Sequence, residues 1–142
     1  MNAGPATRAQ RGSVFWLRPV ADSAAVARTA IDDILPGDGL HEVRFRVRLL
    51  ATELVSNSVL HAGLGPQERL ELRVELLADR VRVEVTDQGR WHDRPTAEAP
   101  PQQGSSGRGL ILVGALADRW GIVKNGTTRV WFEIDLGPRE RN

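Results

Sequence analysis

The chain has 142 residues, of which 41% are hydrophobic and 26% are charged, so it holds enough apolar material for one domain with a real core. Nineteen Lys and Arg face eighteen Asp and Glu, and the net charge of +1 gives no general electrostatic case for nucleic-acid or membrane binding. The chain has no cysteine, which excludes disulfides, thiolate chemistry and Cys-ligated zinc. No stretch approaches the ~20 apolar residues of a membrane span. We expect a cytoplasmic protein.

The N-terminal part of the chain predicts a tail, a strand and a helix. Residues 1–13 are small, polar and basic, which is typical of a flexible tail. Residues 14–20 (VFWLRPV) are a short β-rich run that Pro19 closes or places at a sheet edge. A helix is expected over residues 24–35, because a capping residue precedes this segment and a Pro-Gly pair follows it.

A second, longer helix is expected from His41 to His61. Apolar residues recur at helical spacing along this segment and form one stripe that can face a core. Glycines and a proline after His61 stop the helix. The residues of the stripe are Val43, Val47, Leu50 and Leu54.

After the second helix the apolar period changes from about 3.6 residues to 2. The alternation of apolar and charged side chains predicts half-buried strands over residues 70–76 and 81–85, joined by a tight turn. Residues 89–106 contain three prolines and several Gly and Ser, which predicts a long functional or mobile loop. The remaining predicted elements are a helix over 109–119 and strands over 120–123 and 129–136, with Asn125-Gly126 as the hairpin turn.

Helices and strands occur in separate groups along the chain, which predicts an α+β fold. The expected architecture is a two-layer sandwich, with a mixed β-sheet and helices packed on one of its faces. This single domain is expected to occupy residues 14–137, and residues 138–142 are expected to form a C-terminal tail.

The end of the second predicted helix presents three polar side chains on one face. Glu53, Asn57 and His61 are spaced four residues apart, so they lie in a row beside the apolar stripe. A carboxylate and an amide oxygen one turn apart can hold a hard cation and a proton acceptor side by side. A solvated acid, a helix-end Asn and a His near the negative end of the helix dipole would give the same row, so this segment alone leaves both interpretations open.

Two segments that contain glycine are further candidate sites. Residues 87–89 (Asp-Gln-Gly) follow a predicted strand, where a carboxylate and a glycine would let a flat ligand approach the backbone, although an ordinary turn has the same pattern. Residues 107–110 (Gly-Arg-Gly-Leu) lie where the long loop meets the start of the third predicted helix. N–H groups at a helix start suit phosphate oxygens and Arg108 can add a cation, although a flexible hinge fits equally. The segment is neither a Walker A loop nor a Rossmann fingerprint.

Four segments in this order resemble the GHKL ATP-binding superfamily, which has the Bergerat fold, and within it the anti-sigma-factor serine kinases and their actinobacterial ATP-binding relatives. ATELVSNSVLHAG resembles the N box of the family and VTDQG its first glycine box. SSGRGLILVGALADRWG resembles the second glycine box, and GTTRVWFEI resembles the closing strand pair. The resemblance covers residues 14–136 and implies a Bergerat-type sandwich.

The resemblance also implies ATP and Mg²⁺ as cofactors and gives the candidate residues roles. Asn57 would coordinate Mg²⁺, and Glu53 would be the general base or would position water next to the γ-phosphate. Asp87 would accept a hydrogen bond from the adenine amino group. The other implied nucleotide contacts are Gly89 beside the ring, Gly107, Arg108, Gly109 and Leu110 at the phosphates, and Thr128, favoured over Thr127, at the adenine pocket.

The resemblance implies a protein-serine kinase that phosphorylates an antagonist of the anti-sigma type, sequesters a sigma factor, or does both, as a homodimer. One departure from the pattern bears on this activity: Trp91 stands where the first glycine box usually has a second glycine, and Trp lacks that backbone freedom. A nucleotide-gated binding module without phosphoryl transfer is therefore the alternative. A domain that has lost ATP binding is a third hypothesis.

Overall fold

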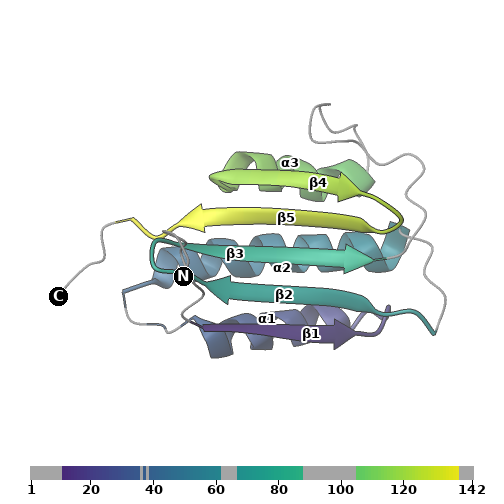
Figure 1. The fold of residues 1–142 in the computed structure, drawn as a ribbon, viewed down its shortest axis with the longest axis horizontal. Helices are drawn as coiled ribbons and strands as arrows, with labels where there is room; N and C mark the ends of the chain where they lie inside the picture. Colours follow the sequence, from purple (N-terminus) through teal and green to yellow (C-terminus); the bar gives the residue numbers. More distant parts are fainter. Residues whose placement is uncertain (1–10, 36, 38, 62–66, 88–104, 138–142) are drawn as a thin grey trace, which may run out of the picture.

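The computed structural model describes residues 11–35, 37, 39–61, 67–87 and 105–137. Within these residues the chain forms five strands and three helices (Figure 1). In chain order they are β1 (Arg11–Leu17), α1 (Ser23–Ile34), α2 (His41–His61), β2 (Leu70–Leu76), β3 (Arg80–Asp87), α3 (Ser105–Leu116), β4 (Arg119–Lys124) and β5 (Thr128–Asp135).

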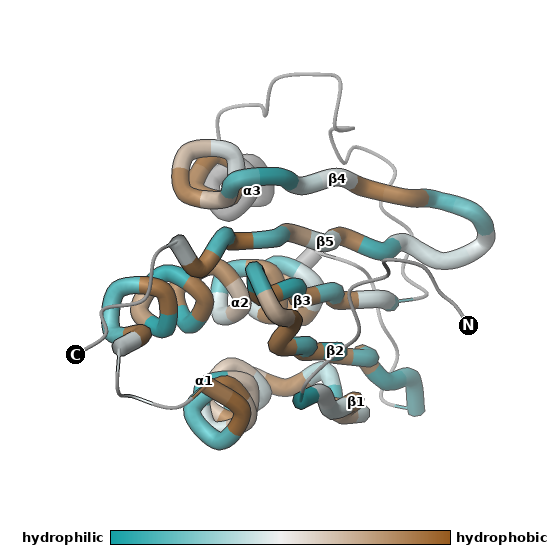
Figure 2. The backbone as a smooth tube through the Cα atoms, turned by 60° about the vertical axis from the view of Figure 1, so that its left-hand side comes forward, coloured by the Kyte–Doolittle hydropathy of each residue, from teal (hydrophilic) through white to brown (hydrophobic). Residues whose placement is uncertain are grey.

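The five strands form one sheet in the order β1-β2-β3-β5-β4. The three helices lie on one face of this sheet, which confirms the predicted α+β two-layer sandwich (Figures 1 and 2). Every neighbouring pair of strands is antiparallel, so the prediction of a mixed sheet was wrong. The chain does run from β3 through α3 to a strand of the same direction, β4, but β5 lies between these two strands and is antiparallel to both.

The core lies between the sheet and the helices. Along β2 and β3 every second side chain is buried, as the alternation of hydrophobic and hydrophilic residues in Figure 2 indicates. The predicted stripe of α2 is buried against this face, since Val47, Leu50 and Leu54 are at most 1% exposed. The apolar stripe of α2 and the apolar rows of the strands therefore set the distance and angle at which α2 crosses the sheet.

The predicted boundaries differ from the observed ones by several residues in places, and the starts of β1 and α3 shift most. β1 begins at Arg11, inside the predicted tail, because residues 11–13 pair with β2 even though their side chains give no β signal. α3 begins at Ser105, four residues before the predicted start at Gly109, and therefore includes the whole Gly-Arg-Gly-Leu segment. Each glycine disfavours a helix interior by roughly 1 kcal/mol, so local propensity alone does not explain this start, and α3 also packs against α2.

Candidate functional site

A group of polar side chains interrupts the core where β3 ends and β5 begins. On β3 the helix-facing row runs through Val81, Val83 and Val85 and then places Asp87 at the next position, where it is 2% exposed. On β5, Thr128 is directly opposite Asp87 and is also buried. Burying a carboxylate in a core position is unfavourable unless polar groups surround it, so this end of the sheet has the character of a binding site.

The last turns of α2 bring two more polar residues to the same place. Periodicity continues the apolar stripe of α2 from Leu54 to positions 57 and 58, but Asn57 and Ser58 occupy them and both are buried. The Ser58 Oγ donates a hydrogen bond to Asp87 Oδ2 over 2.9 Å. This contact joins α2 to the end of β3. Ser58 was not among the predicted site residues, although the interrupted stripe was a signal that could have indicated it.

Asn57 has the environment expected of a ligand-binding amide. Its side chain is 4% exposed, yet its Nδ2 makes no hydrogen bond within the described part of the chain. A buried amide without a partner costs free energy that a bound group can recover. An amide oxygen is a suitable ligand for a hard cation such as Mg²⁺, and an amide N–H suits a phosphate oxygen, so the residues present fit Mg²⁺ with a nucleotide.

Glu53 is one helical turn before Asn57 and shares its side of α2. Its side chain is half-buried, and none of the described residues forms an ion pair or hydrogen bond with its carboxylate. The row predicted from the spacing of Glu53 and Asn57 therefore exists on the helix. The third member of the row, His61, is the last residue of α2.

The structure describes only some of the residues that were predicted to contact the nucleotide from the loop and from α3. Gly107, Arg108, Gly109 and Leu110 lie in the first two turns of α3. Only the N–H groups at the very start of the helix, that of Gly107 among them, lack intrahelical partners, whereas those of Gly109 and Leu110 can bond to helix carbonyls. The first turn of α3 has no acidic side chain that would oppose an anion at this helix end. Gly89, together with Trp91, lies outside the described residues.

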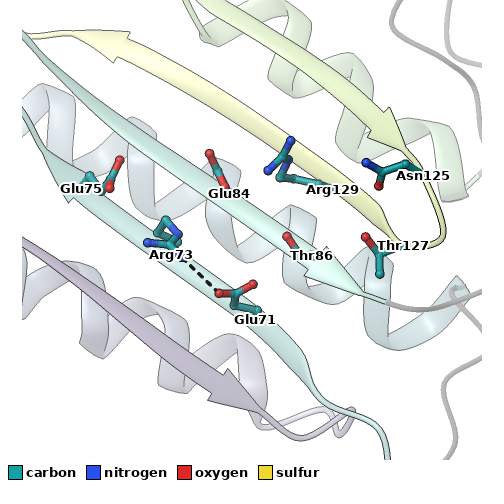
Figure 3. A pocket seen from close by; sticks show the side chains of 8 residues that line it. All are labelled: Glu71, Arg73, Glu75, Glu84, Thr86, Asn125, Thr127 and Arg129. Atoms are coloured by element: carbon teal, nitrogen blue, oxygen red, sulfur yellow. Dashed lines mark hydrogen bonds and ion pairs between the residues drawn. The ribbon is translucent and has the colours of Figure 1, made fainter. Parts of the chain in front are cut away.

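The opposite face of the sheet has a groove of about 400 Å³, which the close view in Figure 3 shows. Charged side chains from β2, β3 and β5 line it, among them Arg73, Glu84 and Arg129. Thr127 and Thr86 face this groove, whereas Thr128 and Asp87, the next residues along, face the helices. The groove is therefore separate from the polar group around Asp87, and the two adjacent threonines lie on different faces.

Comparisons with known proteins identify the family of the chain and agree with its fold. The family model described as a histidine kinase-like ATPase domain matches residues 17–134. Among solved structures, the chain is similar to the RsbU and RsbW domains of Rv1364c from Mycobacterium tuberculosis, with a TM-score of 0.63 and 18% identity over 88% of this chain and 32% of that one. It thus spans about a third of that relative.

A second similar structure is the Acinetobacter baumannii histidine kinase AdeS, with a TM-score of 0.52 and 13% identity over 90% of this chain and 70% of that one. At these identities the two structures support the fold. No curated protein has a matching sequence. Of the helices that the structure describes, none is long and apolar enough to cross a membrane.

Proposed function

Because this chain belongs to the family of histidine kinase-like ATPase domains, we propose that it is an Mg-ATP-dependent protein-serine kinase of the anti-sigma-factor type. Family membership confirms the resemblance to the GHKL superfamily and implies ATP binding. The observation that supports a nucleotide site in this particular chain is the buried amide of Asn57, which makes no described hydrogen bond, next to the buried Ser58–Asp87 pair.

In this proposal the nucleotide lies between the end of α2 and the sheet. Asp87 accepts the hydrogen bond of the adenine amino group, and Thr128 supports the same pocket from the neighbouring strand, β5. Asn57 holds Mg²⁺, which when bound neutralises charge on the phosphates. The first turns of α3, with Gly107, Arg108, Gly109 and Leu110, receive phosphate oxygens, while Gly89 leaves room for the ring.

The chemical step moves one phosphoryl group to a serine. The hydroxyl oxygen of that serine forms a bond to the γ-phosphorus, and the bond from this phosphorus to the β–γ bridging oxygen breaks, so ADP leaves. Glu53 accepts the hydroxyl proton. Its carboxylate has no described partner that would compete for this role. Phosphoryl transfer depends mainly on positioning and charge stabilisation, which a rigid helix such as α2 can supply.

The proposed protein substrate is an antagonist of the anti-sigma type, and a sigma factor is a second proposed partner. We propose that this chain acts on these partners in the cytoplasm. We also propose a homodimer, for which the helix-free face of the sheet is the candidate surface. Trp91 in the first glycine box favours one alternative to the kinase, a nucleotide-gated binding module. In this alternative, ATP binding shapes the surface of the chain that a partner recognises, and no phosphoryl group is transferred.

The kinase proposal is tested with Glu53→Gln, labelled ATP and candidate antagonist proteins. We expect label on a serine of the antagonist with the wild type. Glu53→Gln is expected to reduce transfer by about 10²- to 10⁴-fold, as loss of a general base does, while the Kd for Mg-ATP stays within about threefold. Glu42→Gln, which removes an exposed carboxylate from the first turn of α2, is the matched control and should transfer normally.

Other results would contradict parts of the proposal. Normal transfer by Glu53→Gln would contradict its role as the base. Tight ATP binding by the wild type without label on any partner would favour the nucleotide-gated module. A wild-type chain that does not bind Mg-ATP, or an Asn57→Ala variant that binds it normally, would contradict the proposed site itself.

A further inference from the structure

Ser58 has a contact that is unusual for a serine inside a helix. A helical serine commonly returns its hydroxyl proton to the backbone carbonyl four residues earlier. Here the Oγ of Ser58 donates instead to Asp87 Oδ2, 29 positions away in the sequence, over 2.9 Å. Both side chains are 2% exposed, so water does not compete for this hydrogen bond. The hydroxyl is therefore committed to the carboxylate at the end of β3.

This hydrogen bond fixes how the Asp87 carboxylate is turned. The torsion that rotates a carboxylate about its last carbon–carbon bond is broad, so a carboxylate at a strand end has no strongly preferred angle of its own. Ser58 is held in place by α2, which packs on β3 through buried apolar residues. A donor in a fixed position on one oxygen therefore restricts the plane of both oxygens. A carboxylate has about four acceptor sites, and Ser58 uses one of them.

We infer that Ser58 is a positioning residue, which orients Asp87 so that this carboxylate accepts a hydrogen bond from the exocyclic amine of a purine nucleotide. The inference rests on the proposed nucleotide site and adds a determinant of base selectivity to it. It also means that α2 acts on both ends of the nucleotide. Glu53 and Asn57 serve the phosphate end, and the next residue, Ser58, serves the base end through Asp87.

A purely structural role for Ser58 makes a different prediction. If the hydroxyl only stabilises a buried carboxylate, its removal should weaken the binding of every nucleotide to the same extent, because the whole site would be disturbed. If Ser58 acts through Asp87 on the exocyclic amine, its removal should weaken only nucleotides that have this amine. ATP and purine riboside triphosphate, which differ by this amine alone, distinguish the two roles.

The experiment is isothermal titration of both nucleotides, with Mg²⁺, into the wild type and Ser58→Ala. We expect Ser58→Ala to weaken ATP binding about tenfold, the effect of losing one hydrogen bond to a charged group, and to weaken purine riboside triphosphate less than about twofold. In an Asp87→Asn background, Ser58→Ala should change ATP affinity by less than about twofold, since both variants remove the same interaction.

Ser56→Ala is the matched control. It removes a hydroxyl from the same helix, but Ser56 lines a different pocket, with Ala24 of α1 and Leu60. The affinity of the Ser56→Ala variant for both nucleotides should be that of the wild type. Equal weakening of both nucleotides by Ser58→Ala, or no weakening of ATP binding, would overturn the positioning role and leave the nucleotide site intact. If the wild type binds neither nucleotide, the proposed function and this inference both fall.

Discussion

Glu133 lies near the end of β5 on the helix-free face of the sheet, and arginines cover it so well that it is only 7% exposed. Arg82 and Arg119 each donate a hydrogen bond to it over 2.8 Å, and Arg80 Nε lies 3.3 Å from one carboxylate oxygen. The Arg82 guanidinium also stacks over the Trp131 ring, 4.4 Å from its centre. One carboxylate thus links β3, β4 and β5 on an open surface.

The charge of Glu133 makes stability depend on pH. Burial works to raise the pKa of this carboxyl, but the hydrogen bonds from Arg119 and Arg82 outweigh burial and hold the pKa below its ordinary value of 4.5. A carboxyl with a lowered pKa stabilises the fold fully above the unfolded value, and this stabilisation is lost as the pH falls through the folded value. Acid should therefore weaken the wild type partly through this residue.

We expect Glu133→Gln to lower the free energy of unfolding at neutral pH by about 2 kcal/mol, because three arginines lose their shared acid. Between about pH 5 and pH 3, the variant should lose less stability than the wild type. Urea unfolding across this range measures both effects. Glu75→Gln is the control, since Glu75 lies on the same face without an ion pair among the described residues. Parallel pH profiles for wild type and Glu133→Gln would refute the prediction.

Residue-level prediction from the sequence succeeded where spacing along one helix was sufficient. Glu53 and Asn57 could be placed in one row from their separation alone. The interrupted stripe of α2 could have indicated position 58, but the contacts of Ser58 and Glu133 could not be derived, because their partners are 29 and 51 residues away in the chain. Only pairing of β3 with β5, and packing of α2 on the sheet, brings those partners together.

Among the elements, β4 and β5 pack in a way that requires a glycine. The Trp131 indole lies across Gly121 of the neighbouring strand, and a Cβ built at Gly121 would be 2.9 Å from Trp131 Nε1. No side chain fits that space unless the ring moves. In α3, by contrast, a Cβ at Gly114 would be 3.6 Å from Trp120 Nε1, which is an ordinary contact. The same substitution should have opposite effects in the two elements.

We expect Gly121→Ala to destabilise the fold by about 1–3 kcal/mol, because it pushes Trp131 away from Arg82 and overpacks the strand pair. Gly114→Ala should stabilise the fold by about 0.5–1 kcal/mol, since alanine replaces glycine inside a helix. Chemical unfolding of the two single variants provides the comparison, and each serves as the control for the other. Similar changes in both variants would show that the Trp131 contact does not limit position 121.

At the level of elements, the sequence predicted α2 with both ends correct because a sustained apolar stripe defines a long helix. The start of α3 was misplaced because its glycines are typical of a loop, and only the serines before them favour a helix. The antiparallel sheet could not be derived from local pattern. Alternation shows which residues form strands, but insertion of β5 between β3 and β4 is a property of the whole chain.

At the scale of the whole molecule, the two faces of the sheet carry different kinds of side chain. The helix-covered face holds the polar group around Asp87. The helix-free face is covered by alternating acidic and basic side chains, and the apolar Trp16, which is 65% exposed, lies at its β1 edge. When two copies of the chain pack through this face about a two-fold axis, the acidic side chains of each copy can lie against the basic side chains of the other. The same contact can cover the exposed tryptophan of each copy. We therefore propose the helix-free face as the contact surface of the homodimer.

We expect the wild type to sediment as a dimer and Trp16→Arg to sediment as a monomer, because the variant removes the exposed apolar side chain that the contact would cover and adds a charge whose desolvation is unfavourable. Mg-ATP affinity should change by less than about twofold in that variant, since the proposed site is on the other face. Phe45→Arg makes a comparable change at a residue of α2 that is 66% exposed, and it should leave the dimer intact. A dimer that survives Trp16→Arg, or that dissociates in Phe45→Arg, would place the contact elsewhere, and a monomeric wild type would contradict the homodimer.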